Sequence, residues 1–171
     1  AKAVYDEMRT ELMAGQYLDL LEQAMGGGSV DRALKVVRYK SAKYTIERPL
    51  RSDDQGRSWR SIAKGLPSDF GFPIVVHPHD PDVVYVVPLE PMTRTCPGGS
   101  PAVWRSENGG ASWAKSGKGL PKKNSFFTVL RDSMDVDECK SPSLYVGTTT
   151  GQLWIGRDGG EEWECLFDSL P

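Results

Sequence analysis

The stretch Ser52-Asp53-Asp54-Gln55-Gly56-Arg57-Ser58-Trp59 occurs three times in this chain, with changes, and the rest of the sequence is read from it. The second copy is Ser106-Glu107-Asn108-Gly109-Gly110-Ala111-Ser112-Trp113, and the third is Gly156-Arg157-Asp158-Gly159-Gly160-Glu161-Glu162-Trp163. We call them the first, second and third box. Because they begin at residues 52, 106 and 156, they recur with a period of roughly 50 residues, which indicates an internal repeat.

Each box has the residues of a tight hairpin turn that returns a large side chain to a strand. The third residue has a side-chain oxygen that can accept backbone N–H groups and close an Asx-type turn (Asp54, Asn108 and Asp158). The fifth is a glycine, which tolerates the positive φ of such a turn (Gly56, Gly110 and Gly160). The last is a tryptophan, whose ring we expect to be buried between sheets (Trp59, Trp113 and Trp163). Together with Ser52 and Ser106 at the first position, these residues are predicted to be structural.

Short apolar runs separated by turns surround the boxes, and no long helical pattern interrupts them after Leu50. β-Branched and aromatic residues predict strands near residues 74–76, 83–87, 102–105, 126–130, 144–147 and 152–155. We expect four strands per repeat, with the box in the hairpin between the third and fourth. Four strands at this period are typical of β-propeller blades. The predicted fold class is therefore mainly β, an incomplete propeller of about two blades plus an extra strand.

The boxes resemble the Asp-box, or bacterial neuraminidase repeat, of sialidase-like and sortilin-like propellers, over residues 51–171. This resemblance implies that the boxes lie at the blade periphery and stabilise the fold. A sialidase also needs an arginine cluster and a tyrosine nucleophile, whereas here the arginines are scattered and Tyr85 and Tyr145 occupy matching strand positions. We therefore predict no catalytic residues and a binding or scaffold module that offers its loops to a protein or a glycan. The alternative is a truncated exo-sialidase-like glycoside hydrolase.

Residues 1–50 follow a different, helical pattern. Apolar residues recur at steps of three and four from Ala3 to Met25, which predicts an amphipathic helix. Three glycines follow it, and Ser29 can cap a second helix that continues to about Tyr44. Pro49 disfavours any further continuation. We thus expect two domains, a helical hairpin over 1–50 and the propeller fragment over 51–171.

The two predicted helices resemble part of a trans-isoprenyl (geranylgeranyl or polyprenyl) diphosphate synthase, over residues 11–19 and 38–45. The resemblance implies allylic-substrate contacts for Gln16 and Asp19, and diphosphate contacts for Lys40 and Ser41. The D-D-x-x-D motifs that hold Mg²⁺ in that family are missing from this chain. A prenyl-transfer fragment is therefore the second alternative. Mg²⁺ is expected only under that alternative, and otherwise we expect no cofactor.

Three other segments contain residue types that could bind a metal or a partner. The segment 77–80 contains two histidines and an aspartate, but its proline favours an ordinary loop between strands. The acidic segment 132–138 lacks the glycine and ligand spacing of an EF-hand, which favours a solvated loop. The loop 90–101 is the longest insertion and the best location for a partner contact. We predict no metal site.

Cysteine content and charge limit the remaining function classes. Cys96, Cys139 and Cys165 are widely spaced, which favours free thiols, while a Cys96–Cys139 disulfide stays open. A net charge of −2 indicates no nucleic-acid partner. We find no apolar run near the roughly 20 residues of a membrane span and no signal-peptide pattern, and the compartment stays unassigned. Because two blades cannot close a ring, exposed strand edges predict marginal stability or self-association.

Overall fold

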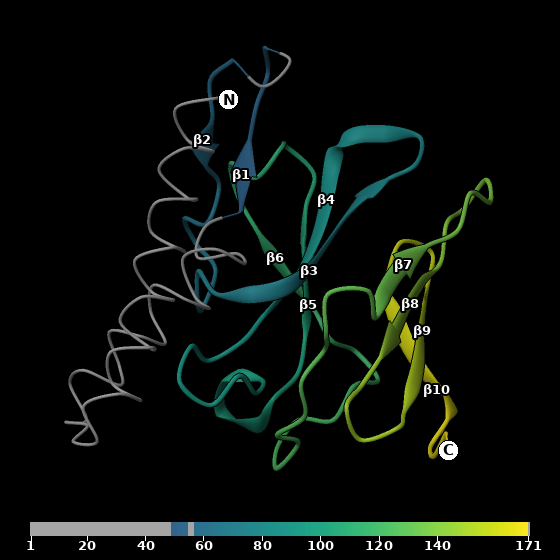
Figure 1. Cartoon of the computed structure of the whole chain (residues 1–171). Coiled ribbons are helices and arrows are strands. Elements are labelled where there is room, and N and C mark those ends of the chain that lie inside the picture. Colours follow the sequence, from purple (N-terminus) through teal and green to yellow (C-terminus); the bar gives the residue numbers. More distant parts are fainter. Residues whose placement is uncertain (1–48, 55–56, 171) are drawn as a thin grey trace, which may run out of the picture. The chain divides into compact units, whose positions relative to one another are not determined.

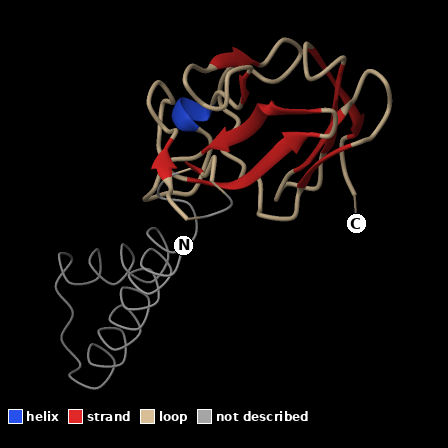
Figure 2. Cartoon of the chain, turned by 90° about the horizontal axis from the view of Figure 1, so that it is seen from above, coloured by secondary structure: helices blue, strands red, loops and turns tan. Residues whose placement is uncertain are grey.

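The computed structural model of the chain describes residues 49–54 and 57–170, which consist of strands and loops (Figures 1 and 2). Within this range the helical element is a short 3₁₀ turn, η2 (Pro97–Gly99). The helices predicted over 3–25 and 29–44 lie outside the described residues, and so do Gln16, Asp19, Lys40, Ser41 and Gly56. The chain divides into two compact units, Ala1–Ser61 and Ile62–Pro171, which we describe separately.

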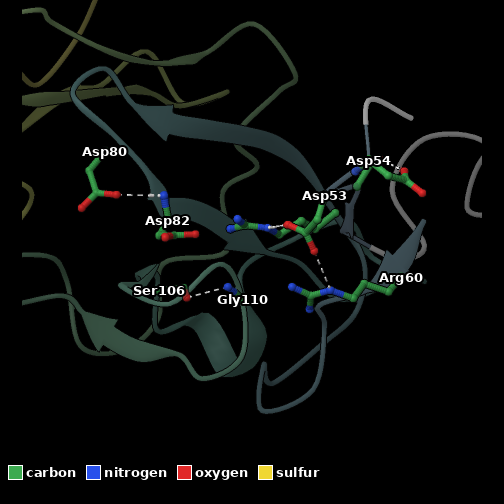
Figure 3. A network of polar contacts seen from close by, with 9 residues as sticks. Asp53, Asp54, Arg60, Asp80, Asp82, Ser106 and Gly110 are labelled. Carbon is green, nitrogen blue, oxygen red and sulfur yellow. Dashed lines mark hydrogen bonds and ion pairs between the residues drawn. The ribbon is translucent and has the colours of Figure 1, made fainter. Parts of the chain in front are cut away.

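The described part of the first unit is a two-stranded hairpin. Strand β1 (Leu50–Arg51) pairs antiparallel with β2 (Arg60–Ser61), and the first box connects them. The Asp53 carboxylate forms ion pairs with Arg51 Nε at 2.6 Å and with Arg60 Nε at 3.3 Å (Figure 3). The hydrogen bond from Arg51, followed by the charges of both arginines, lowers the pKa of Asp53 below its ordinary value. Asp53 therefore joins the two strands through their arginines.

The second unit begins with a four-stranded antiparallel meander, which we call the second sheet. Its strands are β3 (Gly71–His77), β4 (Asp80–Pro88), β5 (Val103–Ser106) and β6 (Ala114–Ser116), each paired with the next along the chain. Residues 83–88 of β4 are all buried, as expected for a β-branched run in a central strand whose two faces are both covered. The second box forms the hairpin between β5 and β6.

A second meander, the third sheet, repeats this arrangement (Figure 1). Its strands are β7 (Met134–Val136), β8 (Leu144–Gly147), β9 (Leu153–Arg157) and β10 (Glu162–Phe167). The third box lies at the turn between β9 and β10, and the first strands of the two sheets, β3 and β7, contact each other. The predicted order of four strands, with a box between the third and fourth, is confirmed in both sheets.

The prediction of a strand over 126–130 is wrong, and the first strand of the third sheet is Met134–Val136. Residues 126–130 do alternate between exposed and buried, with Phe127 and Val129 in the core. However, their backbone groups bond to loops: Cys96 N donates to Phe127 O, and Thr149 N donates to Thr128 O. The acidic segment 132–138, expected to be a solvated loop, supplies β7 because its backbone pairs with β8 and buries Met134.

The core of the second unit lies where the two sheets face each other. Apolar side chains from both sheets meet there, including Val87 and Val103 from the second sheet and Trp154 and Trp163 from the third. Leu120, in the connection between the sheets, is 7% exposed and lies among them. Each such side chain stabilises the fold by about 1.5–3 kcal/mol through burial. The packing of these side chains fixes the positions of the second and third boxes.

Candidate functional site

The first and second boxes close by the same hydrogen bonds. Asp54 Oδ1 accepts the backbone N–H of Ser58 at 2.8 Å, and Asn108 Oδ1 accepts that of Ser112 at 2.8 Å. In both boxes the first serine also donates its hydroxyl to this side chain, with Ser52 Oγ bonded to Asp54 Oδ1 at 2.9 Å. These side-chain oxygens are therefore engaged within their own turns.

Ser106 has an additional role inside the second box. Its hydroxyl oxygen accepts the backbone N–H of Gly110 at 2.8 Å, and its side chain is completely buried (Figure 3). Gly110 has φ +83°, a value that favours glycine. Burial of the hydroxyl is favourable because it both donates and accepts.

The turn of the first box makes the titration of Asp54 testable. Hydrogen bonds from the Ser58 hydroxyl and backbone, together with the Ser52 hydroxyl, lower the pKa of Asp54 to about 2. Because the folded pKa lies below the unfolded one, the stabilisation is present above pH 4 and is lost as the pH falls through about 2. We expect carboxyl NMR titration to give a midpoint near 2, and Ser58→Ala to raise it toward the ordinary 3.8. An unchanged midpoint in Ser58→Ala would contradict this assignment, and Ser61→Ala is the control.

The third box has the same hairpin but a different internal arrangement. Asp158 was expected to accept backbone N–H groups, but it has φ +49° and accepts the hydroxyl of Ser141 at 2.8 Å. The turn closes instead through backbone bonds from Gly160 and Glu161 to Arg157 O. Gly156 replaces the first serine, and a Cβ there would lie 2.7 Å from the Trp163 ring. The ring thus leaves no room for a serine at this position.

The three box tryptophans differ in burial. Trp163 is 3% exposed, as predicted, and Trp113 is half-buried. The prediction is wrong for Trp59, which is 44% exposed. Burial of the ring therefore depends on what packs against the hairpin and, in the third box, on the glycine that leaves room for the ring.

Trp163 joins the third sheet to the end of the second sheet, and we call this contact the tryptophan joint. Its backbone N–H donates to Lys118 O at 2.8 Å, and its indole N–H donates to Ser116 Oγ at 3.1 Å. The Ser116 hydroxyl in turn donates to Gly160 O. One repeat earlier, the Trp113 indole donates to Ile62 O at 2.7 Å. Ser116 and Ile62 occupy the same place, three residues after the preceding box tryptophan.

Gly119 makes the close approach of Trp163 to the second sheet sterically possible. A Cβ at Gly119 would lie 2.0 Å from Trp163 O, and its φ is +97°. The repeated segments Gly65-Leu66-Pro67 and Gly119-Leu120-Pro121 are the signal in the sequence for this position. The roles of Ser116 and Lys118 as partners of Trp163 have no comparable signal, because both residues are ordinary for a strand end.

Beside this joint, a groove of about 750 Å³ runs between the second and third boxes. Its walls include the indole of Trp113 and the polar side chains of Arg105, Glu107 and Lys115, with Gly160 on the opposite side. Arg105 pairs with Glu107 at 2.9 Å, and Lys115 Nζ donates to Ser100 Oγ at 3.3 Å. The groove therefore presents donors and acceptors of both charges next to an aromatic ring.

Two buried polar atoms adjoin this groove without a hydrogen-bond partner. They are the hydroxyl of Tyr85, a residue with no exposed surface, and Nε of Arg105. Burial is the main cause that raises the pKa of Tyr85. Gly159, at the groove wall, would place a Cβ 3.1 Å from Tyr85 Oη and 3.7 Å from the Arg105 guanidinium. Buried polar atoms are normally paired, so these two atoms are exceptions to that rule.

Of the other candidate segments, 77–80 connects the two sheets, whereas 132–138 is bonded within the third sheet. His79 Nε2 donates to the carbonyls of Glu138 at 3.2 Å and Cys139 at 3.0 Å, and its backbone N–H donates to His77 Nδ1. Asp137 accepts the backbone N–H groups of Ser143 and Cys139 and the Tyr145 hydroxyl, and the Ser143 bond is the leading cause that lowers its pKa.

Among the described residues, no three His, Cys, Asp or Glu side chains come close enough to hold a metal ion. Residues 49–54 and 57–170 also include no helix with the length and apolarity that a bilayer crossing requires.

The cysteines are separate thiols in the structure. Cys96 is buried, and burial raises its pKa to about 12, while Cys139 is exposed, so the two do not form a disulfide. Cys96 anchors the loop 90–101, because its backbone N–H donates to Phe127 O at 3.2 Å. Met92, in the same loop, is 66% exposed.

Comparison with known proteins bears on the fold. No family model matches the sequence. A solved structure, the GH74 enzyme of Niastella koreensis, is similar over 74% of this chain, with a TM-score of 0.55 and 18% sequence identity. This chain spans 19% of the length of that enzyme. At this identity the likeness concerns the fold alone, and it agrees with the meander sheets from which propellers are built.

Proposed function

We propose that this chain is part of an Asp-box β-propeller and binds an oligosaccharide, without cleaving it, in the groove between the second and third boxes. The groove itself supports this proposal: its volume of about 750 Å³ is within the range of ligand sites. An aromatic ring beside paired donors and acceptors suits a neutral polyhydroxylated ligand, whose hydroxyls both donate and accept.

The role of the boxes also favours binding over catalysis. Asp54 and Asn108 use their side-chain oxygens to close turns, and Trp163 connects two sheets. A general acid or base must instead reach the group that it protonates or deprotonates. Arg105, which lines the groove and pairs with Glu107 at 2.9 Å, would orient the ligand.

A titration with a panel of neutral and acidic oligosaccharides, followed by backbone amide NMR, tests this function. We expect shifts at groove residues, and Arg105→Lys to weaken binding about tenfold, because lysine keeps the charge but loses the planar donor fork. The control is Arg157→Lys, the same change at an exposed arginine that pairs with Glu164 at 3.3 Å. Shifts that avoid the groove, or equal losses in both variants, would refute the assignment.

A second candidate is a piece of a carbohydrate-cleaving enzyme, which the structural likeness to a GH74 glycoside hydrolase favours. Release of reducing sugar from the same oligosaccharides measures that activity directly. A third candidate, the prenyl-transfer fragment, is tested by turnover of an allylic diphosphate with Mg²⁺. Under the proposed function neither assay gives product.

A further inference from the structure

We propose that Asn108, in the second box, is a modification site at which the chain deamidates spontaneously, and that the closed box keeps this site unreactive. The inference rests on the hydrogen bonds of the box and does not depend on the ligand of the groove. The chain has two asparagines, and Asn108 is the one that a glycine follows. An Asn-Gly pair is especially reactive in this way, because glycine has no side chain to hinder its backbone nitrogen.

The reaction needs only these two residues and water. The backbone nitrogen of Gly109 loses its proton and attacks Cγ of Asn108, so that a C–N bond forms and closes a five-membered succinimide ring. The side-chain nitrogen, Nδ2, takes up a proton and leaves as ammonia. Water then opens the ring at one of its two carbonyls, which produces aspartate or isoaspartate. The net change converts one amide and one water into one carboxylate and one ammonium ion.

In the folded chain the attacking nitrogen is engaged. The Gly109 N–H donates to Asp82 O, in strand β4, at 2.8 Å, and Gly109 is buried. Attack requires this nitrogen to lose its proton, and a hydrogen bond to a carbonyl favours the protonated form. The reaction therefore starts only after Gly109 has separated from Asp82.

The carboxamide that must react is engaged as well. Asn108 Nδ2 donates to Ser112 Oγ at 2.8 Å, while Oδ1 accepts the Ser112 backbone N–H at 2.8 Å and the Ser106 hydroxyl at 3.0 Å. The two donors to Oδ1 polarise the carbonyl, which taken alone favours attack. However, Nδ2 must leave its bond to Ser112, and the nitrogen of Gly109 must first be free. The closed box thus opposes the first step at both reacting groups.

The third box repeats the bond that holds the nitrogen. Gly159, which follows Asp158, donates its backbone N–H to Pro142 O at 2.8 Å. Asp82 and Pro142 occupy matching places, each three residues before the tyrosine of its repeat. An Asp-Gly pair closes the same ring with water as the leaving group. The bond therefore occurs at both places in the chain where glycine follows Asn or Asp.

The first box indicates which product the fold can accept. Asp54 Oδ1 accepts the backbone N–H of Ser58, as Asn108 Oδ1 accepts that of Ser112, and Asp54 Oδ2 accepts the Ser58 hydroxyl. A serine hydroxyl can donate or accept, so an aspartate at position 108 can close the same turn. Isoaspartate adds a carbon to the backbone and displaces the carboxylate from these bonds. Because Asn108 lines the groove, deamidation also places a negative charge there.

Incubation of the full chain in mildly alkaline buffer, with and without urea, tests the inference. Trypsin cuts after Arg105 and Lys115, so the mass gain of deamidation at Asn108 is measured on the peptide 106–115 alone. We expect the folded chain to react more slowly than the chain in urea by about tenfold or more, and by about the same factor as the hydrogen-exchange protection of the Gly109 amide. Equal rates in the two conditions, or a factor unrelated to that protection, would overturn the inference.

Two variants distinguish opening of the box from unfolding of the whole chain. Ser106→Ala removes the buried hydroxyl that bonds Asn108 and the Gly110 N–H, and we expect it to accelerate the reaction in the folded chain about tenfold. Ser112→Ala, at an exposed position, takes its place if that variant does not fold. Gly119→Ala, outside the box, is the control and should leave the rate in the folded chain unchanged. Equal acceleration by box variant and control would mean that global stability protects the site, contrary to the proposal.

Asn108→Asp tests the aspartate product directly. We expect this variant to unfold at the same urea concentration as the parent chain, because Asp54 closes the first box with equivalent bonds. Asn124→Asp, the same substitution outside the boxes, is the reference for the added charge. If Asn108→Asp unfolds at clearly lower urea than both, the second box does not accept a carboxylate and this part of the inference is wrong.

Discussion

Gly119→Ala is expected to lower the free energy of unfolding by about 2–4 kcal/mol, the sum of backbone strain and overpacking. The glycine has φ +97°, a conformation that alanine adopts only at a cost. A Cβ there would also lie 2.0 Å from Trp163 O, which is backbone and cannot rotate away. The change therefore separates Trp163 from Lys118 or distorts both segments.

Gly65→Ala is the matched control for this experiment. Gly65 precedes the same Leu-Pro pair and also has φ +97°, but a Cβ there meets nothing within 4 Å. We expect a loss of about 1 kcal/mol, from strain alone. Urea unfolding followed by tryptophan fluorescence gives both values, and equal losses would show that the close approach to Trp163 is unimportant.

Trp163→Ala is expected to lower the free energy of unfolding by about 3–5 kcal/mol, the range for a large aromatic side chain removed from a core. The ring is 3% exposed, lies against Gly156 and donates to Ser116. Its removal leaves a cavity between the two sheets and removes the indole N–H partner of the Ser116 hydroxyl. Thermal unfolding followed by circular dichroism measures the loss.

Trp59→Ala provides the comparison, since it is the same substitution in the first box. Because Trp59 is 44% exposed, we expect a loss below about 1 kcal/mol. A similar loss for the two variants would mean that the box sequence alone, and not its packing, determines the contribution of the ring.

The sequence was sufficient to predict features that depend on local chemistry. Each box combines an Asx residue, a glycine and a tryptophan, so the hairpin and the strands on either side could be placed from the residues alone. The order of four strands followed from the spacing. The strand Met134–Val136 could not be predicted, because three residues within an acidic segment are too short for a β pattern and their order depends on pairing with β8.

Features that depend on packing between repeats were not predictable in the same way. Gly156 stands where the other two boxes have serine, and it makes room for the Trp163 ring. Trp59 ends its box at the same position as Trp163 does, but the two rings differ in exposure, at 44% and 3%. The groove combines Arg105 with Gly159, which are far apart in the chain, so its existence depends on how the two sheets face each other.

The direction of the tryptophan joint has a consequence for synthesis on the ribosome. Trp113 and Trp163 both reach back to a segment translated earlier, Ile62 and Ser116 respectively. At about 5–20 residues per second, the segment that receives Trp163 leaves the ribosome several seconds before it. Each new hairpin therefore emerges next to a finished surface, and the nascent chain can fold in the order in which it is made.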